Sequence, residues 1–254
     1  MATPLPSVLV TGASTGIGLE FVRQYAECGW RVVATHRGRE TPETLVRLAT
    51  KHPGVEPATM DITKADEVAA LARALRAQPL DILINNAGIT KDDDGASVRQ
   101  NFGHYDFGLM DLIFATNVQG PLRVSQAFAE HLAAGQRKLL VTISSTHGSL
   151  TGPPGTLEEL QGTFYCASKA ALNRQMQVIA HVLAPRGIAV LVLHPGAVYT
   201  ERYDAYVREH GDAWPRHLFI EPQDSVAGMI ASIDKAALPD AARFLDHEGN
   251  DLPW

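Results

Sequence analysis

Short apolar runs alternate with longer stretches of helical spacing along almost the whole chain. The runs have the length of buried strands, and the stretches between them carry apolar residues three and four positions apart. We predict strands over Ser7–Thr11, Arg31–Thr35, Glu56–Met60, Asp81–Asn85, Lys138–Ser144, Ile188–His194 and Ala242–Leu245. We predict helices over Gly16–Cys28, Pro42–His52, Ala65–Ala77, Phe107–Ala134, Phe164–Ala184 and Gln223–Ile233. Strands separated by helices indicate βαβ units, so the pattern predicts an α/β fold, doubly wound, with a parallel sheet.

Composition favours one domain and argues against several classes of partner. The 254 residues are 45% hydrophobic and 20% charged, with a net charge of −6. This acidic balance disfavours binding to nucleic acid or to an anionic membrane surface. The first residues lack the pattern of a signal peptide, and no apolar run approaches the length of a membrane span. We therefore expect a single domain over residues 1–254 in the cytoplasm, where Cys28 and Cys166 stay reduced.

The first predicted strand leads into the first predicted helix through Thr11-Gly12-Ala13-Ser14-Thr15-Gly16-Ile17-Gly18. A glycine-rich turn at a helix N-terminus exposes backbone N–H groups and a partial positive charge, which together bind phosphate. The spacing Gly-x-x-x-Gly-x-Gly differs from a Walker loop, because no Lys-Ser or Lys-Thr follows Gly18. The alternative is an ordinary strand-to-helix turn. The flanking strand and helix favour the phosphate loop.

Tyr165 and Lys169 stand four residues apart at the start of a predicted helix, so the phenol and the ammonium share one face. A cation about 4 Å from the phenol, at an effective dielectric near 20, lowers the tyrosine pKa by roughly three units. This brings the phenol toward neutral pH, where general acid and base catalysis works best. The pair is common by chance, and a surface contact is the alternative interpretation.

Other motifs accompany that pair. Asn85-Asn86-Ala87-Gly88, Ile143-Ser144-Ser145 and His194-Pro195-Gly196 follow predicted strands, and Asn117 lies inside the long predicted helix. With the glycine loop, these motifs resemble the short-chain dehydrogenase/reductase family over almost the whole length of the chain. The resemblance implies a Rossmann-type domain with about seven parallel strands in the order 3-2-1-4-5-6-7. The ending Phe244–Trp254 resembles the sniffer-like and C-factor-like carbonyl reductases.

The resemblance implies a role for each candidate catalytic residue. Tyr165 would exchange a proton with the substrate oxygen, and Lys169 would lower its pKa and hold the nicotinamide ribose. Ser145 would hydrogen-bond the same oxygen, and Asn117 would position a water in a proton relay. Ser145 and Tyr165 are farther apart than in many members of the family, which leaves Ser144 and Ser149 as alternatives for the serine role.

The second predicted strand distinguishes between cofactors. It ends Ala34-Thr35-His36-Arg37, with no acid before Glu40 to accept bonds from the ribose hydroxyls of NAD. The guanidinium of Arg37 suits a 2′-phosphate, so we predict NADP(H), with NAD(H) as the alternative and His36 as a second contact. The family pattern places further cofactor contacts at Gly12, Ser14, Thr15, Gly16, Ile17, Gly18, Asp61, Ile62, Asn86, Ala87, Gly88, Tyr165, Lys169, Pro195, Gly196, Val198 and Thr200.

We therefore expect an NADPH-dependent oxidoreductase that reduces a ketone or aldehyde carbonyl to an alcohol, reversibly, as a homodimer or homotetramer. The alternative is a non-enzymatic dinucleotide-binding signalling or redox-sensor protein of the same fold. Segments at about 90–106, 146–163 and 200–222 would form the substrate pocket, and His147 is a candidate for its wall. The ten histidines show no metal-ligand spacing, so we expect no metal site.

Overall fold

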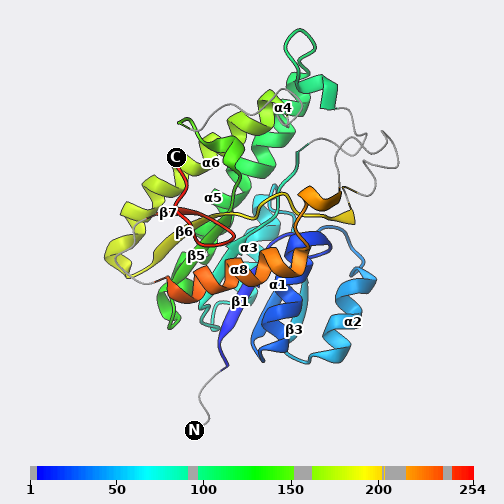
Figure 1. Cartoon of the computed structure of the whole chain (residues 1–254). Coiled ribbons are helices and arrows are strands. Elements are labelled where there is room, and N and C mark those ends of the chain that lie inside the picture. The colour runs from blue at the N-terminus through cyan, green and yellow to red at the C-terminus, as the bar shows by residue number, and fades with distance from the viewer. Residues whose placement is uncertain (1–4, 91–96, 152–161, 202, 204–215, 237–241) are drawn as a thin grey trace.

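Seven parallel strands form one sheet in a computed structural model that describes residues 5–90, 97–151, 162–201, 203, 216–236 and 242–254 (Figure 1). The order is β3-β2-β1-β4-β5-β6-β7, so the predicted fold class and strand order are confirmed. The strands are β1 (Ser7–Val10), β2 (Arg31–His36), β3 (Val55–Thr59), β4 (Ile82–Asn85), β5 (Leu139–Ile143), β6 (Ala189–His194) and β7 (Arg243–Asp246).

Helices connect the strands and cover both faces of the sheet. They are α1 (Gly16–Glu27), α2 (Glu43–Lys51), α3 (Ala65–Ala74), α4 (Phe107–Phe114), α5 (Gly120–Ala134), α6 (Thr163–Leu183) and α8 (Pro222–Lys235). Short 3₁₀ turns occur at Ser97–Gln100, Thr146–Gly148, Ala184–Arg186 and Arg216–Leu218. Within the described part of the chain, no helix is long and apolar enough to cross a membrane.

Two apolar layers hold the helices to the sheet. On one face, Phe21 of α1 and Met229 of α8 pack against strand residues such as Val10. On the other face, Phe128 of α5 and Met176 of α6 pack against strands including β4 and β6. Both faces are covered, which explains why the strands are nearly continuous apolar runs instead of alternating with polar residues.

The long helix predicted over residues 107–134 is interrupted. A π-helical turn, Ala115–Gln119, separates α4 from α5, and the N–H of Gly120 donates to the carbonyl of Ala115. The cause is Pro121, which has no N–H for the carbonyl of Asn117 four residues earlier. The prediction of one uninterrupted α-helix was therefore wrong, and Pro121 was the available signal.

The carboxyl ends of the strands meet along one edge of the sheet. β1 lies between β2 and β4, so the chain changes direction across the sheet between β1 and β4. Crevices for ligands form at this kind of switch point in open α/β sheets. The glycine loop, the Asn86 segment and the Ser145 segment follow β1, β4 and β5 at this edge.

Candidate active site

Two glycines of the loop, Gly12 and Gly18, leave no room for a side chain. A Cβ at Gly18 would lie 2.3 Å from the carbonyl oxygen of Gly12, and a Cβ at Gly12 would lie 2.8 Å from Cα of Ala87. Gly12 and Gly16 also have φ angles of +66° and +55°, which disfavour side chains. The loop therefore brings backbone close to the start of α1, the geometry required to bind a pyrophosphate group.

The segment after β4 is locked to this loop. The side-chain nitrogen of Asn86 donates to the carbonyls of Thr11 at 2.9 Å and Gly12 at 3.1 Å. The Thr11 hydroxyl in turn accepts from the backbone N–H groups of Asn86 and Ala87, each at 3.0 Å. These bonds fix the carboxyl ends of two neighbouring strands in one rigid unit, so Asn86 serves to shape the cradle.

The end of β2 places its two candidate residues differently. Arg37 is exposed, whereas the side chain of His36 is buried, with Nδ1 3.3 Å from the carbonyl oxygen of Arg37. Burial raises the pKa of Asp61, but hydrogen bonds from Thr63 and the charges of Lys64 and Arg37 outweigh it, and the net pKa is lowered. Of the two candidate residues, Arg37 is the one that solvent and a phosphate group can reach at the end of β2.

The π turn holds Asn117 in a fixed position. Its Oδ1 accepts from the N–H of Ile89 at 2.8 Å, and its Nδ2 donates to the carbonyl of Ile89 at 2.8 Å and to Ser168 Oγ at 3.0 Å. Ser168 Oγ donates onward to the carbonyl of Tyr165 at 2.7 Å. The carboxamide therefore joins the segment after β4 to α6, while Pro121 leaves the backbone carbonyl of Asn117 without an α-helical donor.

Tyr165 and Lys169 lie on the same face of α6, as their spacing predicts. Lys169 Nζ is 5.7 Å from the centre of the Tyr165 ring and donates to the carbonyl of Ile143 at 3.0 Å. Burial lowers the pKa of Lys169 to about 8. A buried ammonium thus lies between the tyrosine and the end of β5.

The three serines near the end of β5 have different partners. Ser144 Oγ donates to Asn173 Oδ1 at 2.5 Å in the buried interior, and Ser149 Oγ donates to the carbonyl of Trp254 at 3.2 Å. Ser145 Oγ lies 3.0 Å from Nδ1 of His147, whose ring centre is 6.1 Å from that of Tyr165. Among these serines, Ser145 is the one that an imidazole links to the tyrosine.

A family model described as short chain dehydrogenase matches residues 6–210. The chain belongs to the short-chain dehydrogenase family. The predicted family resemblance is confirmed.

Individual relatives cover the whole chain or most of it. An NADPH-bound carbonyl reductase from chicken fatty liver is 29% identical, covers 99% of this chain and all of its own, and superposes with a TM-score of 0.85. The carbonyl reductase Sniffer of D. melanogaster, 23% identical over 99% of this chain and all of its own, shares the fold with a TM-score of 0.80. C-signal of Myxococcus xanthus is 32% identical over 69% of this chain and 93% of its own.

The residues after β6 lie beside the glycine loop of this short-chain dehydrogenase. A Cβ at Gly16 would lie 3.4 Å from Thr200 Cγ2, and Val198 forms a parallel bridge with Ile220. Gly196 has a φ of +80°, and the carbonyl of Pro195 accepts from Ser225 at 2.6 Å. The 195–200 segment therefore reaches from the end of β6 to the glycine loop.

Two other predicted cofactor contacts, Ile62 and Gly88, lie close to neighbouring elements. Ile62 is buried and lies against Gly120, where a Cβ would be 2.5 Å from Ile62 Cδ1. A Cβ at Gly88 would lie 3.3 Å from Asn117 Oδ1 and 3.8 Å from Lys169 Nζ. Gly88 thus leaves open the space next to the lysine.

The predicted substrate segments fall partly outside the described residues, which exclude 91–96, 152–161, 202 and 204–215. In the described part, the tilted rings of Tyr203 and Phe219 have centres 4.0 Å apart, and the Arg216 guanidinium lies 3.6 Å from the centre of the Tyr199 ring. No cluster of metal-binding side chains occurs among the residues that the structure describes.

Sequence reasoning missed a contact that supports Tyr165. Gln100, whose side chain is fully buried, accepts from the backbone N–H of Tyr165 at 3.1 Å and donates to the carbonyl of Thr90 at 2.7 Å. It supplies a partner to the first turn of α6, where Gly162 has no side chain to cap the helix. A buried glutamine in a polar segment gives no periodic signal, so only the fold reveals it.

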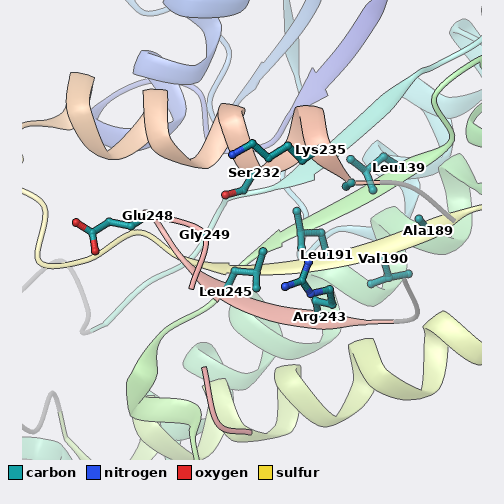
Figure 2. Close-up of a pocket in the computed structure, with 11 residues that line it drawn as sticks. Leu139, Ala189, Val190, Leu191, Ser232, Lys235, Arg243, Leu245, Glu248 and Gly249 are labelled. Carbon is teal, nitrogen blue, oxygen red and sulfur yellow. The ribbon is translucent and has the colours of Figure 1, made fainter. Parts of the chain in front are cut away.

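A small cavity of about 100 Å³ lies away from this site. Figure 2 shows it between α8 and three strands, with Leu139, Ala189 and Arg243 at the amino ends of β5, β6 and β7. Because the candidate catalytic residues follow the opposite ends of the strands, this cavity is separate from the candidate active site.

Proposed function

We propose that this short-chain dehydrogenase uses NADPH to reduce a ketone or aldehyde carbonyl to an alcohol, reversibly, with Tyr165 as the general acid and base. The observation that carries the proposal is the buried ammonium of Lys169 beside the Tyr165 ring. Among the described residues, its hydrogen-bond partner is a backbone carbonyl and not a carboxylate. A cation in that setting favours the phenolate and so lowers the pKa of Tyr165.

The cofactor assignment is supported by two features of the chain. The glycine loop packs so closely on α1 that a Cβ at Gly18 would clash with the carbonyl oxygen of Gly12, and this close packing suits a phosphate cradle. Arg37 is exposed at the end of β2 and suits a 2′-phosphate, with Asp61 nearby for the adenine. The NADPH-bound chicken reductase, which matches over nearly the whole chain, agrees with this choice over NAD(H).

Each catalytic side chain has one task in the proposed reaction. Tyr165 gives its proton to the substrate oxygen in reduction, and Ser145 donates a hydrogen bond to that oxygen as negative charge develops there. The nicotinamide, when bound, supplies the hydride. Ser144 and Ser149 are weaker candidates because their hydroxyls are engaged by Asn173 and Trp254.

Asn117 fits a role in returning the proton from solvent. Its side-chain amide is hydrogen-bonded to Ile89 and Ser168, so we assign the side chain to orienting the turn and not to carrying protons. The backbone carbonyl of Asn117, to which Pro121 offers no α-helical N–H, can accept from a water. We propose that this water and Lys169 reprotonate Tyr165.

The remaining assignments extend the same proposal. Described parts of the 90–106, 146–163 and 200–222 segments adjoin the site, so these segments would shape the substrate pocket. Cys28 and Cys166 form no disulfide, which agrees with a cytoplasmic location. We also propose a homodimer or homotetramer.

The test is turnover by the purified protein with NADPH and a panel of ketones and aldehydes, measured as the loss of NADPH absorbance. Tyr165→Phe should lower kcat by about 10²–10⁴-fold, the usual contribution of a general acid. Tyr25→Phe is the matched control, because the Tyr25 hydroxyl is buried in the core and finds no hydrogen-bond partner among the described residues. Tight NADPH binding without turnover of any carbonyl would instead favour the dinucleotide sensor.

A further inference from the structure

The hydroxyl of Ser145 is contacted twice by one residue. Ser145 Oγ lies 3.0 Å from Nδ1 of the His147 ring and accepts from the backbone N–H of His147 at 3.2 Å. The ring of His147 also approaches that of Tyr165, with centres 6.1 Å apart and planes inclined at 60°. The imidazole therefore contacts one, and approaches the other, of the two side chains that the proposed reaction places on the substrate oxygen.

The direction of the Ser145–His147 hydrogen bond determines what the serine can do. A serine hydroxyl has one proton and two lone pairs. If Nδ1 carries no proton, the serine proton points to Nδ1 and is not available to a substrate. If Nδ1 carries a proton, the ring and the backbone N–H occupy both lone pairs, and the serine proton points elsewhere.

We propose that His147 is a positioning residue that donates from Nδ1–H to Ser145 Oγ and so directs the Ser145 proton to the substrate carbonyl oxygen. The inference rests on the proposed function and adds a residue to it. A donor on Oγ also polarises the serine O–H, which strengthens the bond to an oxygen that gains negative charge. His147 touches the serine and acts through it.

The turn that carries His147 is held firmly enough for this role. Gly148 packs so closely on α6 that a Cβ there would lie 2.6 Å from the carbonyl carbon of Lys169. Its N–H donates to the carbonyl of Ser145 at 2.9 Å, and the carbonyl of Trp254 accepts from the N–H of Leu150 at 2.9 Å. Both sides of the turn are thus anchored, one to the helix of Tyr165 and Lys169.

Three substitutions of His147 distinguish a hydrogen-bond donor to Ser145 from a hydrogen-bond acceptor. His147→Asn can place an amide N–H near the position of Nδ1, and we expect kcat to stay within about threefold of the unsubstituted protein. His147→Ala removes the orienting donor and should lower kcat about tenfold. His147→Asp offers only an acceptor, captures the serine proton, and should lower kcat by about 10²-fold, close to the loss from Ser145→Ala.

A double-mutant cycle tests whether His147 affects kcat through Ser145. In a Ser145→Ala background, the three substitutions should change kcat by less than about twofold, because there is no hydroxyl left to orient. KM for NADPH should stay unchanged throughout. His181→Asp on the exposed surface of α6 is the control for the same change of charge. Equal losses in both backgrounds, or equal activity of the Asn and Asp variants, would overturn the proposal.

Nitrogen NMR of the imidazole provides a readout that needs no turnover. The His147 resonance, assigned by its loss in His147→Asn, should show a protonated Nδ1 and should shift in Ser145→Ala. An unprotonated Nδ1 would overturn the proposed direction of the bond even if the enzyme reduces carbonyls. Failure of the unsubstituted protein to reduce any carbonyl, with Nδ1 protonated, would instead reject the proposed function and with it the catalytic use of the bond.

Discussion

Lys169→Met tests whether the candidate site holds a buried charge at neutral pH. Burial lowers the pKa of Lys169 from its ordinary value of 10.5 to about 8, so the folded chain disfavours the charged form. Since one pKa unit corresponds to 1.36 kcal/mol, the charged side chain costs the fold about 3 kcal/mol. Methionine has a similar length and carries no charge, so the variant escapes this cost.

The sign of the pH dependence follows from proton binding. At pH 7 the lysine is protonated in the folded and the unfolded chain, so the full cost is present in the unsubstituted protein. Between about pH 8 and 10.5 the folded chain loses the proton first, and the unfolded chain then binds more protons. The stability contributed at Lys169 therefore rises with pH over this range. Relative to that of Lys169→Met, the free energy of unfolding of the unsubstituted protein should increase by about 3 kcal/mol from pH 7 to pH 10.5.

The assay is thermal and denaturant unfolding of both proteins, without cofactor, at several pH values from 7 to 10.5. For a domain of this size, about 3 kcal/mol corresponds to a change of roughly 6–12 °C in the difference between the two Tm values. The lost hydrogen bond to Ile143 adds an offset that does not depend on pH, because a neutral amine also donates. The exposed Lys51→Met is the control. Parallel pH curves for Lys169→Met and the unsubstituted protein would refute the buried charge.

Three further substitutions test other parts of the site. Arg37→Asp should raise KM for NADPH by about 10- to 100-fold and shift preference toward NADH, since a charge-assisted bond is lost; steady-state kinetics with both cofactors that match the parent would contradict the assignment. Gly18→Ala places a methyl group 2.3 Å from the carbonyl oxygen of Gly12; we expect a loss of more than about 2 kcal/mol in unfolding free energy and weaker NADPH binding by calorimetry. Pro121→Ala supplies an N–H to the backbone carbonyl of Asn117 and should lower kcat about tenfold without loss of stability or NADPH affinity. An unchanged kcat would argue against a proton relay through a water at this carbonyl.

The fold could be predicted from the sequence because its signals are local and periodic. Strands such as β5 and β6 are buried on both faces, so they appear as continuous apolar runs, and helices such as α1 show one apolar face. Their ends differ from the predictions by three residues or fewer, apart from the helix interrupted at the π turn. The glycine loop is predictable for a related reason, since few other residue types fit the backbone that it requires.

The contacts that position the site could not be predicted in this way. Gln100 and Tyr165 are 65 residues apart, and Asn117 and Ile89 are 28 apart, so their hydrogen bonds depend on how the loops pack. The contact between His147 and Ser145 is short in sequence, but a histidine after a strand is common and its tautomer has no sequence signal. Tertiary hydrogen bonds between unlike segments leave no periodic pattern.

The features that depart from regular secondary structure and ordinary burial nevertheless lie at one edge of the sheet. An interior helical turn contains Asn117 and ends beside a proline, a lysine is buried against a backbone carbonyl, and glycines with positive φ angles open the cradle. The π turn and the buried lysine cost stability, since a regular helix and an exposed lysine would be more stable. The glycines cost conformational entropy on folding. Natural sequences retain such costs mainly where function requires them. The cluster formed by Asn117, Lys169 and the glycine loop at one sheet edge is therefore an argument for catalysis there that is independent of the family match.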